Sequence, residues 1–168
     1  QQVPRVQSDA MKETGLKYPP FGFNTKELRD GIDTDTLKVP GLGDPNVPES
    51  FSVWTIDLSD KPQVVAKIKT GYLVGEPVED IPAVGGSSPN SLVATDDYVF
   101  VSNGNNDNIS VIDVKTDTIL THIALKPHKL VSHFRGVIPF GLALSPDQKR
   151  LYVAESGINA IGVIRLED

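Results

Sequence analysis

The sequence predicts an all-β protein that forms a β-propeller sector, an incomplete propeller of about two to three four-stranded antiparallel blades with long loop insertions. Short runs rich in Val, Ile, Leu, Phe and Thr alternate with turn residues along residues 51–168. Some runs, such as residues 98–101 (Tyr-Val-Phe-Val), are apolar on both faces, as in a sheet covered on both sides. The pattern also repeats along the chain, and repeats of this size are typical of propellers.

The clearest repeating unit spans residues 89–125, which hold four apolar runs joined by turn residues. The runs cover residues 91–95, 98–102, 109–114 and 118–125. Each break contains Asp, Asn or Gly, or the tripeptide Lys-Thr-Asp, so we expect four strands joined by hairpin turns. A small sheet of this kind, sandwiched between copies of itself, is a propeller blade.

Other segments match strands of this unit, which we designate a to d in chain order. Residues 139–143 match 89–93, 151–154 match 99–102, 161–164 match 109–112, and 53–57 match 109–113. We therefore expect strands c and d within residues 51–69, a complete blade at 89–125, and strands a, b and c within 139–168. In chain order, the strands are expected at residues 51–58, 63–69, 91–95, 98–102, 109–114, 118–125, 139–145, 151–155 and 160–166.

Long connections separate the blades. Residues 70–88 and 126–138 each join a strand d to the next strand a, whereas the turns inside the blades are short. Asp57 and Asp113 close equivalent strands, and we expect their side chains to cap the turns that follow.

Residues 1–50 are rich in Pro and Gly and predict an irregular insertion or connection. One helical turn is expected at residues 25–31, with Thr25 as its cap, and the end of a strand at residues 3–7. A long segment of this kind is typical of either an insertion packed on a rim or a binding lid, and we favour the insertion.

One stretch resembles a known family of repeats. The run at residues 139–164 is similar to the YVTN family of β-propeller repeats, and the resemblance extends over about residues 51–168. The family's tetrapeptide is matched by Tyr152-Val153-Ala154-Glu155 and, degenerately, by Phe100-Val101-Ser102-Asn103. Glu155 stands where the family usually has Asn. Proteins with this resemblance are often exported, so a periplasmic or extracellular location is expected.

A second resemblance concerns what accompanies the propeller. Residues 84–92, 102–113 and 135–147 look similar to propellers fused ahead of a phosphoesterase domain of the alkaline-phosphatase type. This resemblance covers only the propeller part, so no catalytic residue is carried over. Propellers close with about four to eight blades, so we expect the remaining blades, as partners, from the parent chain or from another copy.

The composition excludes several classes of function. The chain of 168 residues has a net charge of −6, which disfavours nucleic acid and anionic membranes as partners. It has no cysteine, so disulfides, thiol catalysis and cysteine-ligated metals are excluded. No apolar run approaches the length of a membrane span. The first residue is Gln rather than Met, so we expect a processed chain or a piece of a longer protein.

The long connections and residues 1–50 should fall on one face of the expected propeller, where the d–a and b–c connections lie. Loops carried by a rigid scaffold commonly bind ligands. We therefore predict a ligand-binding face with the polar residues Asn103, Asn105, Asp107, His128, His133, Arg135 and Glu155. We predict no catalytic residue and no bound metal or cofactor. The alternative is that this face binds a divalent cation.

Two segments of this face are open to a metal interpretation. Residues 103–108 (Asn-Gly-Asn-Asn-Asp-Asn) offer oxygen ligands for a divalent cation, but they also favour a tight turn and lack the acidic spacing of a calcium loop. We favour the turn. His128 and His133, near Arg135, would suit a metal pair or a bound anion, but no third metal ligand has suitable spacing. A solvated loop is favoured there.

Three functions remain open, because a propeller fold by itself settles none. The first is a non-catalytic module that presents a loop-rich face to a ligand or a neighbouring domain. The second is the propeller portion of a metal-dependent phosphoesterase whose catalytic domain is not in this chain. The third, ranked last, is a lactonase-like propeller hydrolase, which needs metal ligands at several inner strands where only Asn90 is found.

Overall fold

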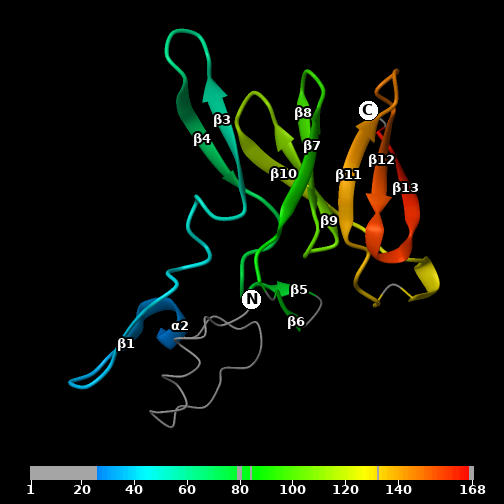
Figure 1. Ribbon diagram of the computed structural model, residues 1–168. Coiled ribbons are helices and arrows are strands. Elements are labelled where there is room, and N and C mark those ends of the chain that lie inside the picture. The colour runs from blue at the N-terminus through cyan, green and yellow to red at the C-terminus, as the bar shows by residue number, and fades with distance from the viewer. Residues whose placement is uncertain (1–25, 79–80, 84, 132, 167–168) are drawn as a thin grey trace. The chain divides into compact units, whose positions relative to one another are not determined.

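The computed structural model describes residues 26–78, 81–83, 85–131 and 133–166. The strand end expected at residues 3–7, and Thr25 as a cap, lie outside these residues. The chain forms two compact units (Figure 1), one made of Gln1–Val47 with Leu73–Gly85 and the other of Pro48–Tyr72 with Gly86–Asp168. We name them the hairpin unit and the sheet unit.

The hairpin unit holds a short helix, α2 (Lys26–Asp30), and two small antiparallel hairpins. One pairs β1 (Gly31–Asp33) with β2 (Lys38–Pro40), and the other pairs β5 (Pro77–Val78) with β6 (Ile81–Pro82). Helix α2 is the helical turn that the sequence predicts. Both hairpins fall in segments expected to be irregular, because their strands are too short to show an alternating apolar pattern.

The sheet unit is all-β and consists of three small antiparallel sheets, with strand orders β3-β4, β10-β9-β8-β7 and β11-β12-β13. All nine predicted strands are present, each end within two residues of its expected position. Their bounds are β3 (Ser52–Asp57), β4 (Gln63–Lys69), β7 (Pro89–Ala94), β8 (Tyr98–Asn103), β9 (Asn108–Asp113), β10 (Thr118–Ala124), β11 (Pro139–Leu144), β12 (Arg150–Glu155) and β13 (Ala160–Arg165). We name the four-stranded sheet the middle sheet.

The middle sheet is covered on both faces, as its two-sided apolar pattern predicts. On one face Phe100 packs in a buried cluster with Leu151 and Val153 of β12. On the other face Val101 packs in a second cluster with Ile68 of β4. Successive side chains of a strand point to opposite faces, so neighbouring residues of β8 serve different cores. Each such fully buried side chain contributes roughly 1.5–3 kcal/mol relative to an exposed one.

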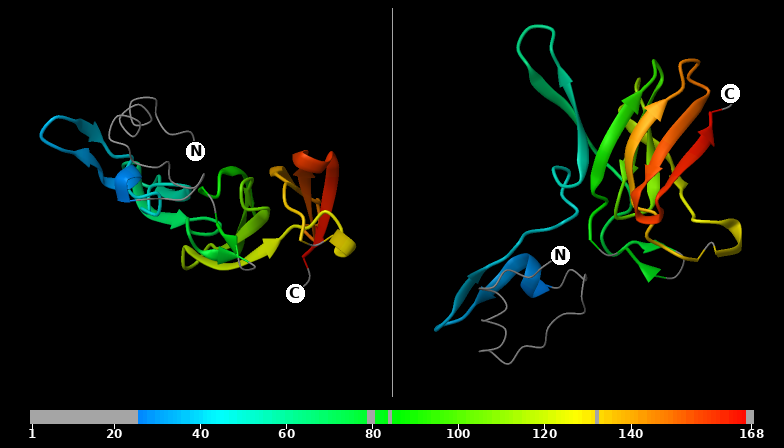
Figure 2. Two further views of the ribbon diagram at one scale, coloured as in Figure 1. Left: turned by 90° about the horizontal axis from the view of Figure 1, so that it is seen from below. Right: turned by 45° about the vertical axis from the view of Figure 1, so that its right-hand side comes forward.

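Strands β7 and β11 lie next to each other in the views of Figures 1 and 2 and join the middle sheet to the third sheet. Asn90 Nδ2 donates to the backbone oxygen of Pro139 over 3.2 Å, and Ser102 Oγ donates to that of Phe140 over 2.7 Å. Polar side chains of the middle sheet thus satisfy carbonyl groups at the start of β11.

Short turns that cap one end of the sheet unit are held by aspartates. Asp57 accepts from Ser59 N, and Asp113 accepts from the backbone nitrogens of Lys115 and Thr116, each over 2.8–2.9 Å. These backbone hydrogen bonds lower the pKa of both carboxyl groups. The predicted capping role of Asp57 and Asp113 is therefore confirmed. None of the helices in the described part of the chain is long and apolar enough to cross a membrane.

Candidate ligand-binding face

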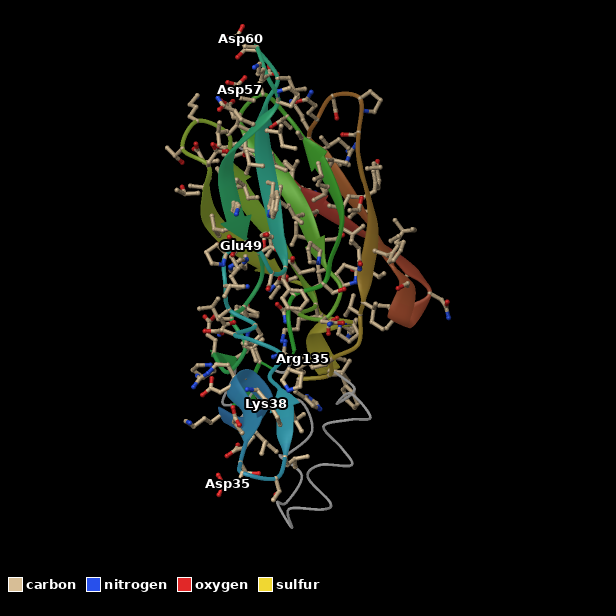
Figure 3. The ribbon with its side chains drawn as sticks, turned by 60° about the vertical axis from the view of Figure 1, so that its left-hand side comes forward. Asp35, Lys38, Glu49, Asp57, Asp60 and Arg135 are labelled. Carbon is tan, nitrogen blue, oxygen red and sulfur yellow. The ribbon has the colours of Figure 1, made fainter. Side chains whose placement is uncertain are left out.

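The predicted ligand-binding face lies at the end of the sheet unit away from the aspartate-capped turns. Figure 3 shows Asp57 and Asp60 at one end of this unit and Arg135 toward the other. Two turns contribute to this face, residues 104–107 between β8 and β9, and η2 (Ser156–Ile158) between β12 and β13. The connections that precede β7 and β11 lie against these turns, as their hydrogen bonds show.

Residues 103–108 form the tight turn that the sequence favours. Asp107 has a left-handed backbone with φ of 49°, a conformation that Asp and Asn tolerate better than most residues. Gly104 N donates to the carbonyl of Ser88 and Asn105 N to that of Ser87, each over 3.0 Å. The turn is thereby attached to the connection that leads into β7.

The carboxylate of Asp107 attaches the same turn to the second connection. Its two oxygens accept from Gly136 N over 2.6 Å and from Ile138 N over 2.8 Å. Its backbone oxygen accepts from Leu125 N over 2.8 Å, at the other end of that connection. Asp107 is only 5% exposed, so these hydrogen bonds form with little competition from water. We refer to this arrangement as the Asp107 staple.

Two neighbouring amides of the turn hold the two ends of the 70–88 connection, at Tyr72 and at Gly86. Asn106 Oδ1 accepts from Tyr72 N over 2.9 Å, and Asn105 Nδ2 donates to the carbonyl of Gly86 over 3.2 Å. Gly71 must remain glycine, because an added Cβ would lie 2.3 Å from Asn106 Oδ1 and 2.5 Å from Ser87 Cβ. One four-residue turn therefore fixes segments from both long connections.

Beneath the turn lies a buried polar network. Asn103 Nδ2 donates over 2.7 Å to both Asn108 Oδ1 and Ser110 Oγ, and Ser110 Oγ also accepts from Gly71 N over 3.0 Å. Ser110 Oγ lies 3.1 Å from His122 Nδ1. Asn103, Asn108 and Ser110 are fully buried, and in the described residues Asn103 Oδ1 and Asn108 Nδ2 have no hydrogen-bond partner.

The turn in the third sheet occupies the equivalent position with different side chains. Ser156 N donates to the carbonyl of Ile138 over 3.1 Å, and Gly157 N to that of Val137 over 2.9 Å. Asn159 has φ of 53°, as Asp107 does one sheet earlier. Glu155 stands where the middle sheet has Asn103. Burial, and secondly the charge of Asp107, raise the pKa of the Glu155 carboxyl.

The connection at residues 126–138 carries the remaining predicted site residues on the surface. His128, His133 and Arg135 are exposed. His128 Nδ1 accepts from Leu130 N over 3.2 Å, and the ring of His133 lies 4.7 Å from that of Phe134. In the part of the chain that the structure describes, no group of three or more His, Asp or Glu side chains could hold a metal ion.

The predicted site residues thus fall into two groups. Asn103, Asp107 and Glu155 are buried and hold or line the turns, whereas Asn105 and the three residues of the 126–138 connection are exposed. Sequence reasoning missed Tyr72, Ser110 and His122. Their contacts with the turn or with the polar network beneath it join residues 7 to 39 positions apart, and no local pattern marks such pairs.

No model of a known protein family matches the chain, and no curated protein sequence matches it. Solved structures that match include hydrazine synthase of Kuenenia stuttgartiensis, with 23% identity and a TM-score of 0.39 over 57% of this chain. They also include a functionally unknown protein from Desulfotomaculum acetoxidans DSM 771, with 15% identity and a TM-score of 0.43 over 70% of this chain. The chain spans 24% and 31% of the length of these two proteins. TM-scores below 0.5 establish neither a common fold nor a common function.

Proposed function

We propose that this chain is a sector of a larger β-propeller with YVTN-like repeats, and that it acts as a non-catalytic module whose loop face binds a ligand or a neighbouring domain. The propeller interpretation is supported by three antiparallel sheets of two, four and three strands, which pack face to face. They follow the order c–d, a–b–c–d and a–b–c, which is what a segment cut from a ring of blades would contain.

The equivalence of two turns also supports repeated blades. In both the middle and the third sheet, two consecutive N–H groups of the b–c turn donate to the two carbonyls that precede strand a. The residues before those strands, Ser88 and Ile138, share a left-handed backbone with φ of 55° and 51°. A β-branched residue is rarely found there, so the same conformation at Ile138 as at Ser88 supports the proposal of repeated blades.

Features of the two outer sheets favour the presence of further blades beside them. In the described residues, β3 pairs only with β4 and β13 only with β12, so each has an unpaired edge. Exposed apolar residues lie on both outer sheets, including Val65 of β4 (55%) and Ile161 of β13 (65%). Unpaired edges and apolar surface of this kind favour further strands and blades, supplied by the parent chain or by another copy.

The observation that carries the binding role is the attachment of both long connections to one turn. The Asp107 staple and the Asn106 contact hold loops from different parts of the sequence in one fixed arrangement. Preorganised loops lose little conformational entropy when they bind, which is what a recognition surface requires.

The test is to record backbone amide NMR spectra of the chain while screening small-molecule and peptide fragments. If the loop face is the binding surface, shift changes will cluster in residues 70–72, 86–88, 103–108, 126–138 and 155–159. Asp107→Asn, which weakens the staple, should reduce binding, whereas Asp60→Asn at the opposite end serves as the matched control. Shift changes confined to the aspartate-capped turns would contradict the proposal.

A further inference from the structure

Asn103 and Gly104 form the only Asn-Gly pair in the sequence, and they lie where β8 ends and the turn at residues 103–108 begins. We name this turn the middle turn. In an Asn-Gly pair the backbone nitrogen of glycine can attack the side-chain carbonyl carbon of asparagine, because glycine has no Cβ to hinder the approach. The pair therefore has the composition of a modification site, and its contacts decide when it reacts.

The reaction at such a pair needs only water and base. Gly104 N loses its hydrogen to hydroxide and forms a bond to Asn103 Cγ, while the bond from Cγ to Nδ2 breaks and ammonia leaves. The five-membered succinimide ring formed in this way adds one water molecule and opens to aspartate or to isoaspartate. One water is thus consumed and one ammonia released, and no residue is oxidised or reduced.

The folded middle turn blocks both reacting groups. Gly104 N donates to the carbonyl of Ser88 over 3.0 Å, and Asn103 Nδ2 donates to Asn108 and Ser110 over 2.7 Å each. Asn103 is fully buried, so the hydroxide and water that the reaction needs do not reach it. In the described residues no donor contacts Asn103 Oδ1, the oxygen on which negative charge would develop. The middle turn must therefore open before the pair reacts.

The Asp107 staple controls how easily the middle turn opens. The Asp107 carboxylate ties the turn to Gly136 N and Ile138 N, and it lies three residues beyond the reacting nitrogen of Gly104. A turn opens locally with a free energy set by the contacts that must break, without unfolding of the whole sheet. The staple supplies two charge-assisted hydrogen bonds to that set, so release of the staple and exposure of Asn103 are linked.

From these contacts we infer that Asn103 is a deamidation site that the folded middle turn protects and that reacts whenever this turn opens. The modification is one-way. Either product lacks the two N–H groups that bind Asn108 and Ser110, and aspartate places a negative charge in a buried position. Isoaspartate adds a backbone atom where residue 103 pairs with Asn108 across β8 and β9. Each modification thus permanently weakens the turn that holds both long connections, whatever the loop face binds.

The experiment follows conversion of amide to acid by mass spectrometry, with the change located at residue 103 by fragment spectra. The full chain and a synthetic peptide of residues 100–107, which lacks the fold, are incubated at the same neutral pH and temperature. We expect the chain to react at least about tenfold more slowly than the peptide, because a stable turn is rarely open. Hydrogen exchange of the Gly104 amide, measured in parallel, should be slowed by the same factor, because both reactions need the same opening.

Asp107→Asn, which weakens the staple, should speed deamidation of Asn103 about threefold or more, with an equal rise in Gly104 exchange. Asp60→Asn, at the opposite end of the sheet unit (Figure 3), is the matched control and should react as the unaltered chain does. Equal rates in the chain and the peptide would overturn the inference, as would fast Gly104 exchange beside an unmodified Asn103. Trp54, the single tryptophan, reports whether each variant is folded. If Asp107→Asn unfolds, the two slowing factors of the unaltered chain still decide.

Discussion

The turns at 103–108 and 155–160 share one backbone arrangement and differ in what their side chains do. Both attach to the carbonyls before the first strand of their sheet, and both place a left-handed residue at the fifth position, Asp107 or Asn159. In the middle sheet the side chains form a buried amide network and the staple. In the third sheet Glu155 is buried with a raised pKa, and Asn159 is exposed.

The difference teaches that two turns with the same backbone conformation can hold different segments in place, because their side chains differ. In both sheets, the shared backbone conformation lets the turn donate hydrogen bonds to the carbonyls that precede the first strand. In the described residues, the middle turn also holds the connection to the next sheet, through the Asp107 carboxylate, and no further sheet follows the third one. Stability and organisation of the loop face should therefore depend unequally on equivalent positions.

The largest effect is expected for Asp107→Ala. The substitution leaves Gly136 N and Ile138 N without their acceptors, and hydrogen bonds to a charged group contribute about 1.5–3 kcal/mol each. We expect the free energy of unfolding of the sheet unit to fall by about 4 kcal/mol, measured by Trp54 fluorescence during urea unfolding. Faster hydrogen exchange at the Gly136 and Ile138 amides should accompany it. Unchanged exchange at both amides would show that the staple does not restrain the connection.

Gly157→Ala should have the next largest effect. A Cβ at this position would lie 1.9 Å from the Gly136 carbonyl oxygen, so backbone atoms would have to move. Overpacking of this kind costs about 2–3 kcal/mol, which the same urea titration measures. Gly141→Ala in β11 is the control, because its Cβ would lie 3.7 Å from Ala154 Cβ, an ordinary contact. Equal stabilities of the two variants would argue against the close approach of residues 136 and 157.

A smaller loss, about 1 kcal/mol, is expected for Asn159→Ala, because alanine tolerates a left-handed backbone less well than asparagine does. This position is equivalent to Asp107 but has no staple. Subtracting its effect from that of Asp107→Ala therefore isolates the contribution of the two charged hydrogen bonds. If both alanine variants lose the same stability, the carboxylate contributes nothing beyond the turn conformation.

Glu155→Gln should give the smallest effect, with a sign that depends on pH. Because burial raises the pKa of Glu155, the folded state keeps this proton to higher pH than the unfolded state does. The stability of the unaltered protein therefore falls as pH rises from about 4.5, the ordinary value, through the raised pKa. The Gln variant lacks this loss, so it should be the more stable form at pH 7 and equal at pH 4. A constant difference across that range would exclude titration of Glu155 as the cause.

Most of the strand pattern was predictable from the sequence. Alternating and two-sided apolar runs, separated by Asp, Asn and Gly, located all nine strands of the sheet unit and the covered middle sheet. The Asp57 and Asp113 caps were predictable because they act within three residues. The propeller itself, its number of blades and its family remain predictions.

The interactions of the loop face were not predictable, because they join residues far apart in the sequence. Asp107 was expected on a ligand-binding face, but its pairing with residues 29 and 31 positions away has no local signature. Glu155 was identified as a departure from the pattern of the family that the repeat resembles, yet its burial, with the side chain beside Gly162 of β13, has no local signature. The hairpins β1–β2 and β5–β6 were missed since strands of two or three residues carry no periodicity.

The network beneath the middle turn has a consequence for the protonation of His122. The Ser110 hydroxyl receives N–H groups from Gly71 and from Asn103, which occupy both of its oxygen lone pairs. Its single hydrogen must then point to His122 Nδ1, so this nitrogen is an acceptor and the neutral imidazole carries its hydrogen on Nε2. The contact with Ser110 thus favours the imidazole tautomer that carries its hydrogen on Nε2.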